Sequence, residues 1–341
     1  MNIKDIHYKH IIESQQFNVN QLIWLFGLTQ AIKELFETKD GREKLRQCLP
    51  GKIINTFFYE PSTRTRLSFV HAAYHLGASQ VTGTENASEF SSAIKGETLE
   101  DTMRILCSYH PDVIIMRSKK TGDAERAVKI TDQFGVPLIN AGDGSGQHPT
   151  QSLTDVFTIY ERFALLKRRT FEKLTVVMCG DLKNGRTVRS LSYLLAKFPK
   201  MKLVYMSPAK LQIGADILEY LAKHKICHEI YTEKDPMEDV LLQADVLYMT
   251  RVQKERMNAR LYKKVAGIFQ FTKEKIQAMP EESIIMHPLP RVDEISTDVD
   301  DDPRAYYFKQ AQNGMFVRMA LLLMLLDPKK AEGILHYRVK K

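Results

Sequence analysis

The chain has 341 residues, of which 44% are hydrophobic and 26% are charged, with 17 glycines and 13 prolines. This composition excludes a disordered chain, and at roughly 150 residues per domain the length predicts about two domains. The longest apolar run, residues 319–326, is much shorter than the ~20 residues of a membrane span, so we expect no membrane insertion. The charged start of the sequence lacks a signal-peptide pattern, which favours a cytoplasmic protein.

The 49 basic and 41 acidic residues give a net charge of +8, which is compatible with anionic substrates, nucleic acid or an acidic partner. Basic clusters at residues 167–169 and 338–341 have no interleaved aromatic residues, so a solvated surface is favoured over nucleic-acid binding. The cysteines lie far apart, without a histidine at metal-ligand spacing, which predicts four core thiols and no metal site: Cys48, Cys107, Cys179 and Cys227.

Strand-like and helical patterns alternate along the chain. An amphipathic helix at residues 22–35 precedes a β-branched and aromatic strand at residues 52–59. Further strands are expected at residues 112–116, 136–140, 175–179, 202–206, 227–231, 245–249 and 283–286, and helices at residues 67–74, 148–166, 188–198 and 316–326. This alternation is typical of parallel sheets covered by helices on both faces, so the fold class is α/β. The helix at 148–166 is the best place to divide the chain, and the polar tail from Asp327 is expected to be mobile.

Ligands of parallel α/β sheets bind beyond the carboxyl ends of the strands. Ser62-Thr63-Arg64-Thr65 follows the first strand and opens a helix, where backbone N–H groups, hydroxyls and a guanidinium favour a phosphate. A well-capped, charged helix start explains this stretch equally well.

Two further strand ends carry polar side chains. Arg117 ends the next strand, and a glycine-rich turn after the third leads to His148 and to Gln151 in the first turn of a helix. A histidine at a helix start is more often a surface or capping residue. Its place in a glycine-rich turn favours a ligand contact.

The second half repeats this arrangement with different chemistry. Arg186 follows one strand, and Arg251 with Gln253 follows another, so two arginines could hold a dicarboxylate; surface ion pairing is the alternative. After the last strand, the prolines around Pro288 and Leu289 leave carbonyl groups that could accept from a ligand NH₂. A rigid structural turn is the favoured interpretation of that stretch in isolation.

Across residues 50–326 these motifs together resemble the catalytic chains of the aspartate carbamoyltransferase family. One such motif could match by chance, but the full set in this order could not. The motifs are Pro61-Ser-Thr-Arg-Thr-Arg-Leu-Ser-Phe, Lys95-Gly-Glu-Thr, Met116-Arg117, Asn140-Ala-Gly-Asp-Gly, Gln147-His-Pro-Thr-Gln, Gly180-Asp-Leu-Lys, Gly185-Arg-Thr-Val, Met249-Thr-Arg-Val-Gln-Lys-Glu-Arg and His287-Pro-Leu-Pro-Arg-Val-Asp-Glu-Ile.

The resemblance implies transfer of the carbamoyl group of carbamoyl phosphate to the amine of L-aspartate, in pyrimidine biosynthesis, without a cofactor or metal. It implies a carbamoyl-phosphate domain at residues 1–155, on which helix 312–326 packs back, and an aspartate domain at residues 156–311. It also implies a homotrimer whose active sites lie between chains, with no nucleic acid or membrane as partner.

Residue roles carry over by matching motifs. The phosphate and carbamoyl group would contact Ser62, Thr63, Arg64, Thr65, Arg117, His148, Gln151, Pro288 and Leu289. Thr65, Arg117 and His148 would polarise the carbonyl oxygen, while Gln151 and the carbonyls of Pro288 and Leu289 would take the NH₂. Aspartate would contact Lys95, Arg186, Arg251 and Gln253, and the neighbouring subunit would supply Ser91 and Lys95.

Two positions depart from the family pattern. Leu261 stands where family members carry a glutamate that pairs with a neighbouring subunit's lysine in the unliganded state, and Asn184 replaces the aromatic residue that usually follows the lysine, here Lys183. A leucine cannot accept hydrogen bonds, so we expect that this pair does not hold a low-affinity state.

Two other functions compete with this one. An ornithine carbamoyltransferase would share the first domain, but Arg251 would repel a cationic acceptor, and His287-Pro-Leu-Pro differs from the His-Cys-Leu-Pro typical of that group. A non-catalytic scaffold would not need every ligand-facing residue. A regulatory chain, nucleotide effectors and assembly beyond the trimer are left open.

Overall fold

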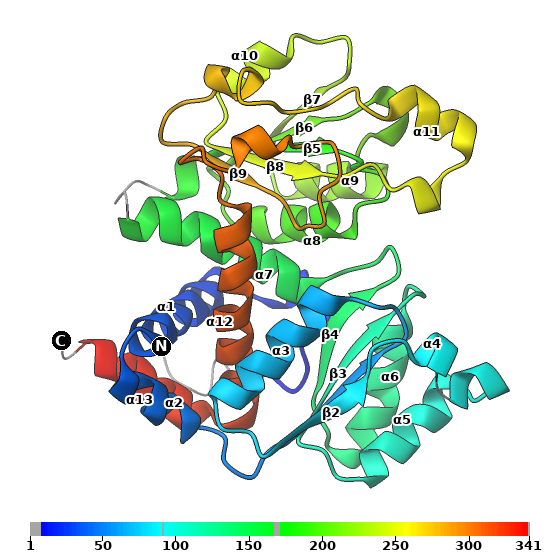
Figure 1. Ribbon diagram of the computed structural model, residues 1–341, viewed down its shortest axis with the longest axis vertical. Coiled ribbons are helices and arrows are strands. Elements are labelled where there is room, and N and C mark those ends of the chain that lie inside the picture. Colours follow the sequence, from blue (N-terminus) through cyan, green and yellow to red (C-terminus); the bar gives the residue numbers. More distant parts are fainter. Residues whose placement is uncertain (1–7, 91, 167–170, 340–341) are drawn as a thin grey trace. The chain divides into compact units, whose positions relative to one another are not determined.

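The computed structural model describes residues 8–90, 92–166 and 171–339 and divides into two compact units. Met1–Gln151 and Asn313–Lys341 form the first unit, and Ser152–Gln312 forms the second. Each unit has its own parallel sheet with helices against it (Figure 1), which confirms the predicted fold class. Within the described ranges, no helix has the length and apolar character to cross a membrane.

The sheet of the first unit has the strand order β2-β1-β3-β4, with every pair parallel. The strands are β1 (Ile53–Phe58), β2 (Gln80–Thr84), β3 (Val113–Ser118) and β4 (Leu138–Asp143). Helix α3 (Thr63–His75) lies on one face, and α5 (Leu99–Ser108) with α6 (Asp123–Thr131) lies on the other (Figure 1). Because both faces are covered, β3 and β4 are buried along their whole length.

The remaining helices of the first unit are α1 (Val19–Phe36), α2 (Lys39–Arg46), α4 (Ala87–Phe90) and α13 (Pro328–Val339). Two long helices, α7 (Pro149–Tyr160) and α12 (Tyr307–Leu326), begin in one unit and end in the other. A π-helical turn at Glu161–Leu166 continues α7, so the predicted helix at 148–166 is confirmed over most of its length.

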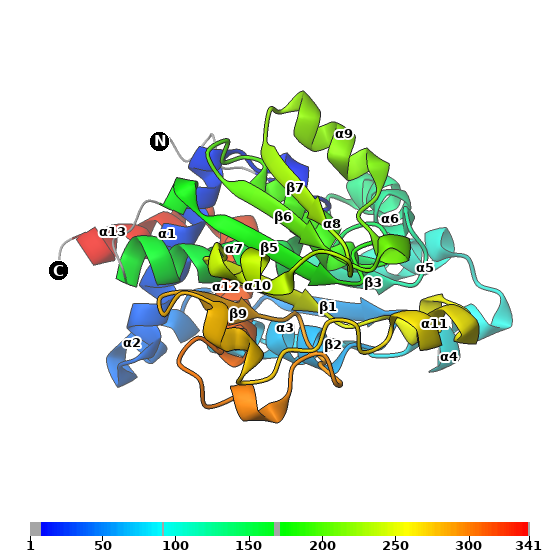
Figure 2. The same ribbon diagram turned by 90° about the horizontal axis from the view of Figure 1, so that it is seen from above.

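The sheet of the second unit has the order β7-β6-β5-β8-β9, again all parallel. Its elements are β5 (Thr175–Gly180), α8 (Arg186–Leu195), β6 (Lys202–Met206), α9 (Ala215–Lys223), β7 (Cys227–Tyr231), α10 (Met237–Leu242), β8 (Val246–Thr250), α11 (Ala259–Val265) and β9 (Ile284–Met286). Figure 2 shows β5, β6 and β7 of this sheet with α8 and α9 close beside them. Alternate residues of β5 face opposite layers: Val177 packs with Val240 of α10, and Met178 meets Ser192 of α8.

Two expectations are wrong. The tail after Asp327 is not mobile but forms α13, which packs on α1 with Ala331 fully buried, and Lys330 Nζ donates hydrogen bonds to the carbonyls of Gln47 and Cys48. Of the four predicted core thiols, Cys227 is exposed, because β7 is an edge strand with a neighbour on one side only. The basic cluster at 167–169 lies outside the described residues.

Candidate active site

The turn between β1 and α3 carries the first group of predicted residues. Ser62 occupies the N-cap of α3, and its hydroxyl donates to Thr65 Oγ1 at 3.0 Å instead of accepting from the helix backbone. Thr63 Oγ1 donates to Glu85 Oε1 at 3.1 Å, and Arg64 is exposed beside them. The hydroxyls therefore cluster at the positive end of a 13-residue helix, where an anion is stabilised.

Arg117 lies at the end of the neighbouring strand β3. It pairs in register with Phe58 of β1, and its backbone carbonyl accepts from the N–H of Tyr59 at 2.8 Å. Its guanidinium is buried and held from two sides, by Glu60 at 2.9 Å and by the carbonyl of Ala141 at 3.1 Å. The sheet thus places a fixed cation beside the turn that opens α3.

The turn after β4 positions His148 and Gln151. Pro149 is the first residue of α7, and the N–H of Gln151 donates to the carbonyl of His148 at 3.0 Å. His148 is buried, with Nδ1 3.4 Å from Thr150 Oγ1. Gly144 has a φ of +49°, and a Cβ there would lie 2.5 Å from the backbone nitrogen of Thr121, so only glycine suits this turn.

Sequence reasoning missed the N-terminal segment that supports this turn. Gln147 Oε1 accepts from the N–H of Ser14 at 2.9 Å, and Gln147 Nε2 donates to Gln15 Oε1 at 2.6 Å. Asn140 Nδ2 donates to the carbonyl of Ile12 at 3.0 Å. These contacts join residues more than 120 positions apart, so no local pattern indicates them.

The first unit therefore gathers its predicted residues at the carboxyl ends of three adjacent strands, β1, β3 and β4. Lys95 lies elsewhere, exposed at the end of a short 3₁₀ turn that precedes α5. Ser91, predicted to act with Lys95, lies outside the described residues.

In the second unit, the ends of β5 and β8 approach each other very closely. Gly180 pairs in register with Thr250, and a Cβ on Gly180 would lie 2.0 Å from the carbonyl oxygen of Thr250. This approach brings the turn before Arg186 next to the loop that begins with Arg251.

Buried Asp181 joins the turn before Arg186 to the loop that begins with Arg251. One carboxylate oxygen accepts from the N–H and side-chain amide of Asn184, and the other accepts from the N–H of Gln253 at 3.2 Å. Arg186 is the first residue of α8, directly after this turn. The structure thus places all three predicted dicarboxylate contacts on two adjacent strand ends, and the bridging role of Asp181 is one that sequence reasoning missed.

Glu255 holds the Arg251 guanidinium in a two-point ion pair. The hydrogen bonds raise the pKa of Arg251 and lower the pKa of Glu255, so both groups are charged at neutral pH. Arg251 lines a pocket of the second unit whose other walls include Gly180, Pro208, Met249, Val252, Tyr262, Phe269, Gln270, Val292, Asp293 and Glu294. A cation fixed in a pocket wall is suited to bind a carboxylate.

The segment after β9 is fixed by a buried histidine. His287 Nδ1 accepts from the N–H of Leu289 at 2.7 Å, so the ring proton is on Nε2, which donates to Glu294 Oε1 at 2.7 Å. Burial alone would raise the pKa of Glu294, but the hydrogen bonds from His287 and from the backbone lower it overall. Leu289 has a φ of +54°, and its bond to Pro290 is cis. The hydrogen bonds through His287 thus tie the backbone that carries Pro288 and Leu289 to Glu294.

Two family models match the chain. The aspartate/ornithine carbamoyltransferase carbamoyl-P binding domain matches residues 9–161, and the aspartate/ornithine carbamoyltransferase Asp/Orn binding domain matches residues 172–325.

Curated relatives and solved structures point the same way. A chloroplastic aspartate carbamoyltransferase of Oryza sativa subsp. japonica is 46% identical over 93% of this chain and 84% of its own length. The aspartate carbamoyltransferase catalytic subunit of Clostridium novyi is 45% identical over 93% of this chain and 98% of its own. The catalytic subunit of M. jannaschii aspartate transcarbamoylase has a TM-score of 0.82 and 39% identity, with 95% of this chain and 99% of that chain covered. A Trypanosoma cruzi aspartate transcarbamoylase in complex with N-(phosphonacetyl)-L-aspartic acid has a TM-score of 0.83 and 35% identity, with coverage of 96% and 98%.

Proposed function

This chain belongs to the aspartate/ornithine carbamoyltransferase family, and from that premise we propose that it is an aspartate carbamoyltransferase. It transfers the carbamoyl group of carbamoyl phosphate to the amine of L-aspartate, giving N-carbamoyl-L-aspartate and phosphate for pyrimidine biosynthesis. The observation that supports the choice of acceptor is the pair of arginines, Arg186 and Arg251, which follow the adjacent parallel strands β5 and β8 in segments that Asp181 joins. Two guanidinium groups suit the two carboxylates of aspartate, and they would repel the ammonium side chain of ornithine.

The proposed roles in the first unit follow from charge and position. Ser62, Thr63, Arg64 and Thr65 bind the phosphate at the N-terminus of α3. Arg117 bridges the phosphate and the carbonyl oxygen.

Amine attack on the carbonyl carbon builds an oxyanion, which Thr65, Arg117 and His148 stabilise. Gln151 and the carbonyls of Pro288 and Leu289 hold the carbamoyl NH₂. The departing phosphate takes the proton that the amine loses, so the reaction needs positioned cations more than a strong base.

In the second unit, Arg186 and Arg251 bind the aspartate carboxylates, with Gln253 in support. Glu255 supports this role because it fixes the plane of the Arg251 guanidinium. The first unit would be the carbamoyl-phosphate domain and the second the aspartate domain.

A colorimetric assay for the ureido product, run side by side with aspartate and ornithine, tests the reaction. We expect product with aspartate only. Product with ornithine at a comparable rate, or no product with either amino acid, would overturn the assignment.

We also propose that the chain forms a homotrimer, in which Lys95 and Ser91 reach the active site of a neighbouring copy. The exposure of Lys95 supports this, as do the exposed apolar residues Leu67 and Tyr74 on the outer side of α3, at 43% and 53% of their surface. A cytoplasmic location stays a prediction, because the relatives include chloroplastic enzymes.

Mixed trimers test the shared site. Lys95→Ala and Arg117→Ala chains, each inactive alone, are dissociated, mixed in equal amounts and reassembled. If each site takes Arg117 from one chain and Lys95 from its neighbour, about a quarter of the sites recover both residues. Light scattering confirms the assembly. Recovery of no activity by a reassembled trimer would show that the sites are not shared.

A further inference from the structure

Among the described residues, one group of contacts joins the start of the segment that carries Lys95 to the residues after β1 and β3, and another joins its end to α6. At its start, Ser88 Oγ donates to the carbonyl of Tyr59 at 2.8 Å and lies 2.9 Å from Lys119 Nζ. Lys119 follows the last residue of β3. The start of the segment is therefore tied to the strand end that carries Arg117.

The end of the segment is organised by the first turn of α5. Thr98 is the N-cap of this helix and accepts from the N–H of Asp101 at 3.1 Å. Thr102 Oγ1 donates to Glu97 Oε2 at 2.8 Å and to the carbonyl of Thr98 at 3.0 Å. Because Glu97 is two residues after Lys95, these bonds fix the backbone at which the Lys95 segment meets the helix.

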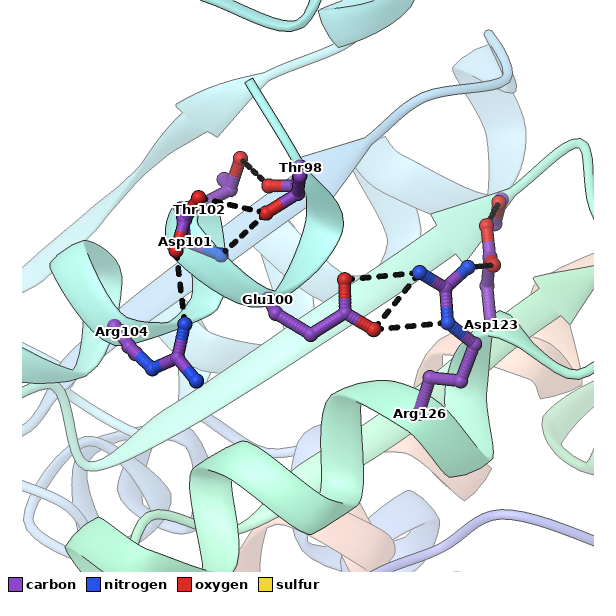
Figure 3. Close-up of polar contacts among 8 residues, drawn as sticks. Thr98, Glu100, Asp101, Thr102, Arg104, Asp123 and Arg126 are labelled. Carbon is purple, nitrogen blue, oxygen red and sulfur yellow. Dashed lines mark hydrogen bonds and ion pairs between the residues drawn. The ribbon is translucent and has the colours of Figure 1, made fainter. Parts of the chain in front are cut away.

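Arg126 of α6 then joins this helix start to β3 (Figure 3). Its Nε and Nη2 donate to the two oxygens of Glu100 at 2.9 Å each, and its Nη1 donates to Asp123 Oδ1 at 2.8 Å. The other oxygen of Asp123 accepts from the hydroxyl of Ser118 at 2.5 Å. Ser118 directly follows Arg117, so an unbroken series of side-chain contacts runs from the strand end of Arg117 to the start of α5.

The solvent exposure of Arg126 and Glu100 indicates whether their ion pair stabilises the fold or orients α5. The side chains of Arg126 and Glu100 are 48% and 30% exposed, and ion pairs that open to water contribute little to the free energy of unfolding. The two-point contact does fix direction, because a guanidinium and a carboxylate that share two hydrogen bonds lie in one plane. Orientation, more than stability, is what this pair supplies.

We infer that Arg126 is a positioning residue for carbamoyl transfer: through Glu100 it sets the start of α5, and hence Lys95, in a fixed place relative to the strand end of Arg117. This inference rests on the proposed function, in which Lys95 serves the active site of a neighbouring copy. If the Lys95 segment changes its orientation, Lys95 moves away from the substrate of the neighbouring copy. Activity then falls although no catalytic residue has been removed.

Arg126→Gln tests the inference, with Arg104→Gln as the matched control. Arg104 lies on α5 and pairs with Asp101 three residues earlier, and its side chain is 52% exposed, but its ion pair joins no two elements (Figure 3). Both variants remove one half-exposed arginine from an ion pair. Only Arg126→Gln removes an ion pair that joins α6 to the first turn of α5, and the apolar packing between the two helices is unchanged in both variants.

We expect Arg126→Gln to lower kcat/KM for aspartate about tenfold, mainly through KM, since a displacement of about 1 Å can cost ~100-fold in rate. Hydrogen exchange of the amides at residues 94–98 should accelerate, whereas the Tm should stay close to that of Arg104→Gln. Because Glu100 acts through Arg126, the double variant Glu100→Gln/Arg126→Gln should lose no more activity than Arg126→Gln alone.

Several outcomes overturn the inference. One is an active Arg126→Gln enzyme with the kinetics of Arg104→Gln, and another is a fall in Tm with unchanged KM, which would show a structural role only. If the unmodified protein transfers no carbamoyl group, the proposed function fails. In that case, amide hydrogen exchange at residues 94–98 is the measurement that tests whether Arg126 positions the Lys95 segment. Faster exchange in Arg126→Gln but not in Arg104→Gln supports this role, and equal exchange in the two variants overturns it.

Discussion

Replacement of His287 by leucine should destabilise the second unit strongly, because this ring satisfies two buried groups at once. The side chains of His287 and Glu294 are 1% and 5% exposed, and the histidine both accepts from the N–H of Leu289 and donates to the carboxylate. An amide left without a partner costs about 1–3 kcal/mol, and a buried charge that loses its partner about 3–5 kcal/mol. The N–H of Val292 still donates to Glu294, so we expect about 4 kcal/mol, near the lower end of the combined range.

The double variant His287→Leu/Glu294→Leu separates these two costs. It removes the unpaired charge, so only the cost of the Leu289 amide should remain, at about 1–3 kcal/mol. The assay is urea unfolding followed by circular dichroism, with all proteins at one concentration because subunit assembly shifts the midpoint. A loss below about 1 kcal/mol in the single variant, or a double variant less stable than the single, would refute the reasoning.

The pH dependence should differ in sign between the two proteins. In the unmodified protein the pKa of Glu294 is lowered on folding, so this carboxylate stabilises the fold above the unfolded pKa of about 4.3 and loses that effect as pH falls through the folded pKa. In His287→Leu the carboxylate is buried without its partner, which raises its pKa above the unfolded value. That variant should therefore gain stability as pH falls from neutral towards 4.5.

Three further predictions concern other parts of the chain. Arg117→Ala should lower kcat at least ~100-fold, by analogy with the loss of one oxyanion donor, and near-normal turnover would contradict its role. Gly180→Ala should cost about 3 kcal/mol or more, because its φ is +109° and its Cβ would meet the carbonyl of Thr250, whereas Gly333→Ala, with open space around it, should be neutral or stabilising by thermal unfolding. Lys183→Ala should leave a hyperbolic aspartate saturation curve unchanged; a sigmoidal curve that this substitution flattens would show that the lysine holds a low-affinity state.

The sequence predicts best where structure is determined locally. Eight strands are predicted from β-branched or aromatic runs, and each is confirmed within a few residues. Seven of them contain buried residues, whereas the edge strand β7 contains none. The missed strand, Gln80–Thr84, is a polar edge strand with a glycine in it. Gly83 is required there because a Cβ would lie 1.7 Å from the carbonyl oxygen of Thr56, a constraint that depends on a strand 27 residues earlier.

The candidate site shows the same division. The residues at strand ends, such as Arg117 and Arg251, are predictable because parallel strands present their carboxyl ends at one edge of a sheet. The groups that orient these residues cannot be predicted from the sequence, because Glu60 and Asp181 act across turns and between strands. The helix α13 was missed for a related reason: its polar sequence is stabilised by contacts with α1 and α2, nearly 300 residues earlier.

The order in which the chain supplies its two units has a consequence for synthesis. The second unit is one continuous stretch, Ser152–Gln312, whereas the first needs both ends of the chain: Lys33 Nζ donates to Asn313 Oδ1, and Arg318 Nη2 lies 3.4 Å from Thr150 Oγ1. On the ribosome, the half that is translated later can finish folding before the half that is translated first. The nascent first unit cannot complete the contacts of α1 until α13 has emerged from the exit tunnel. Loss of α13 would therefore damage the fold around α1 and α2, which lie beside it in space but nearly 300 residues earlier in the sequence.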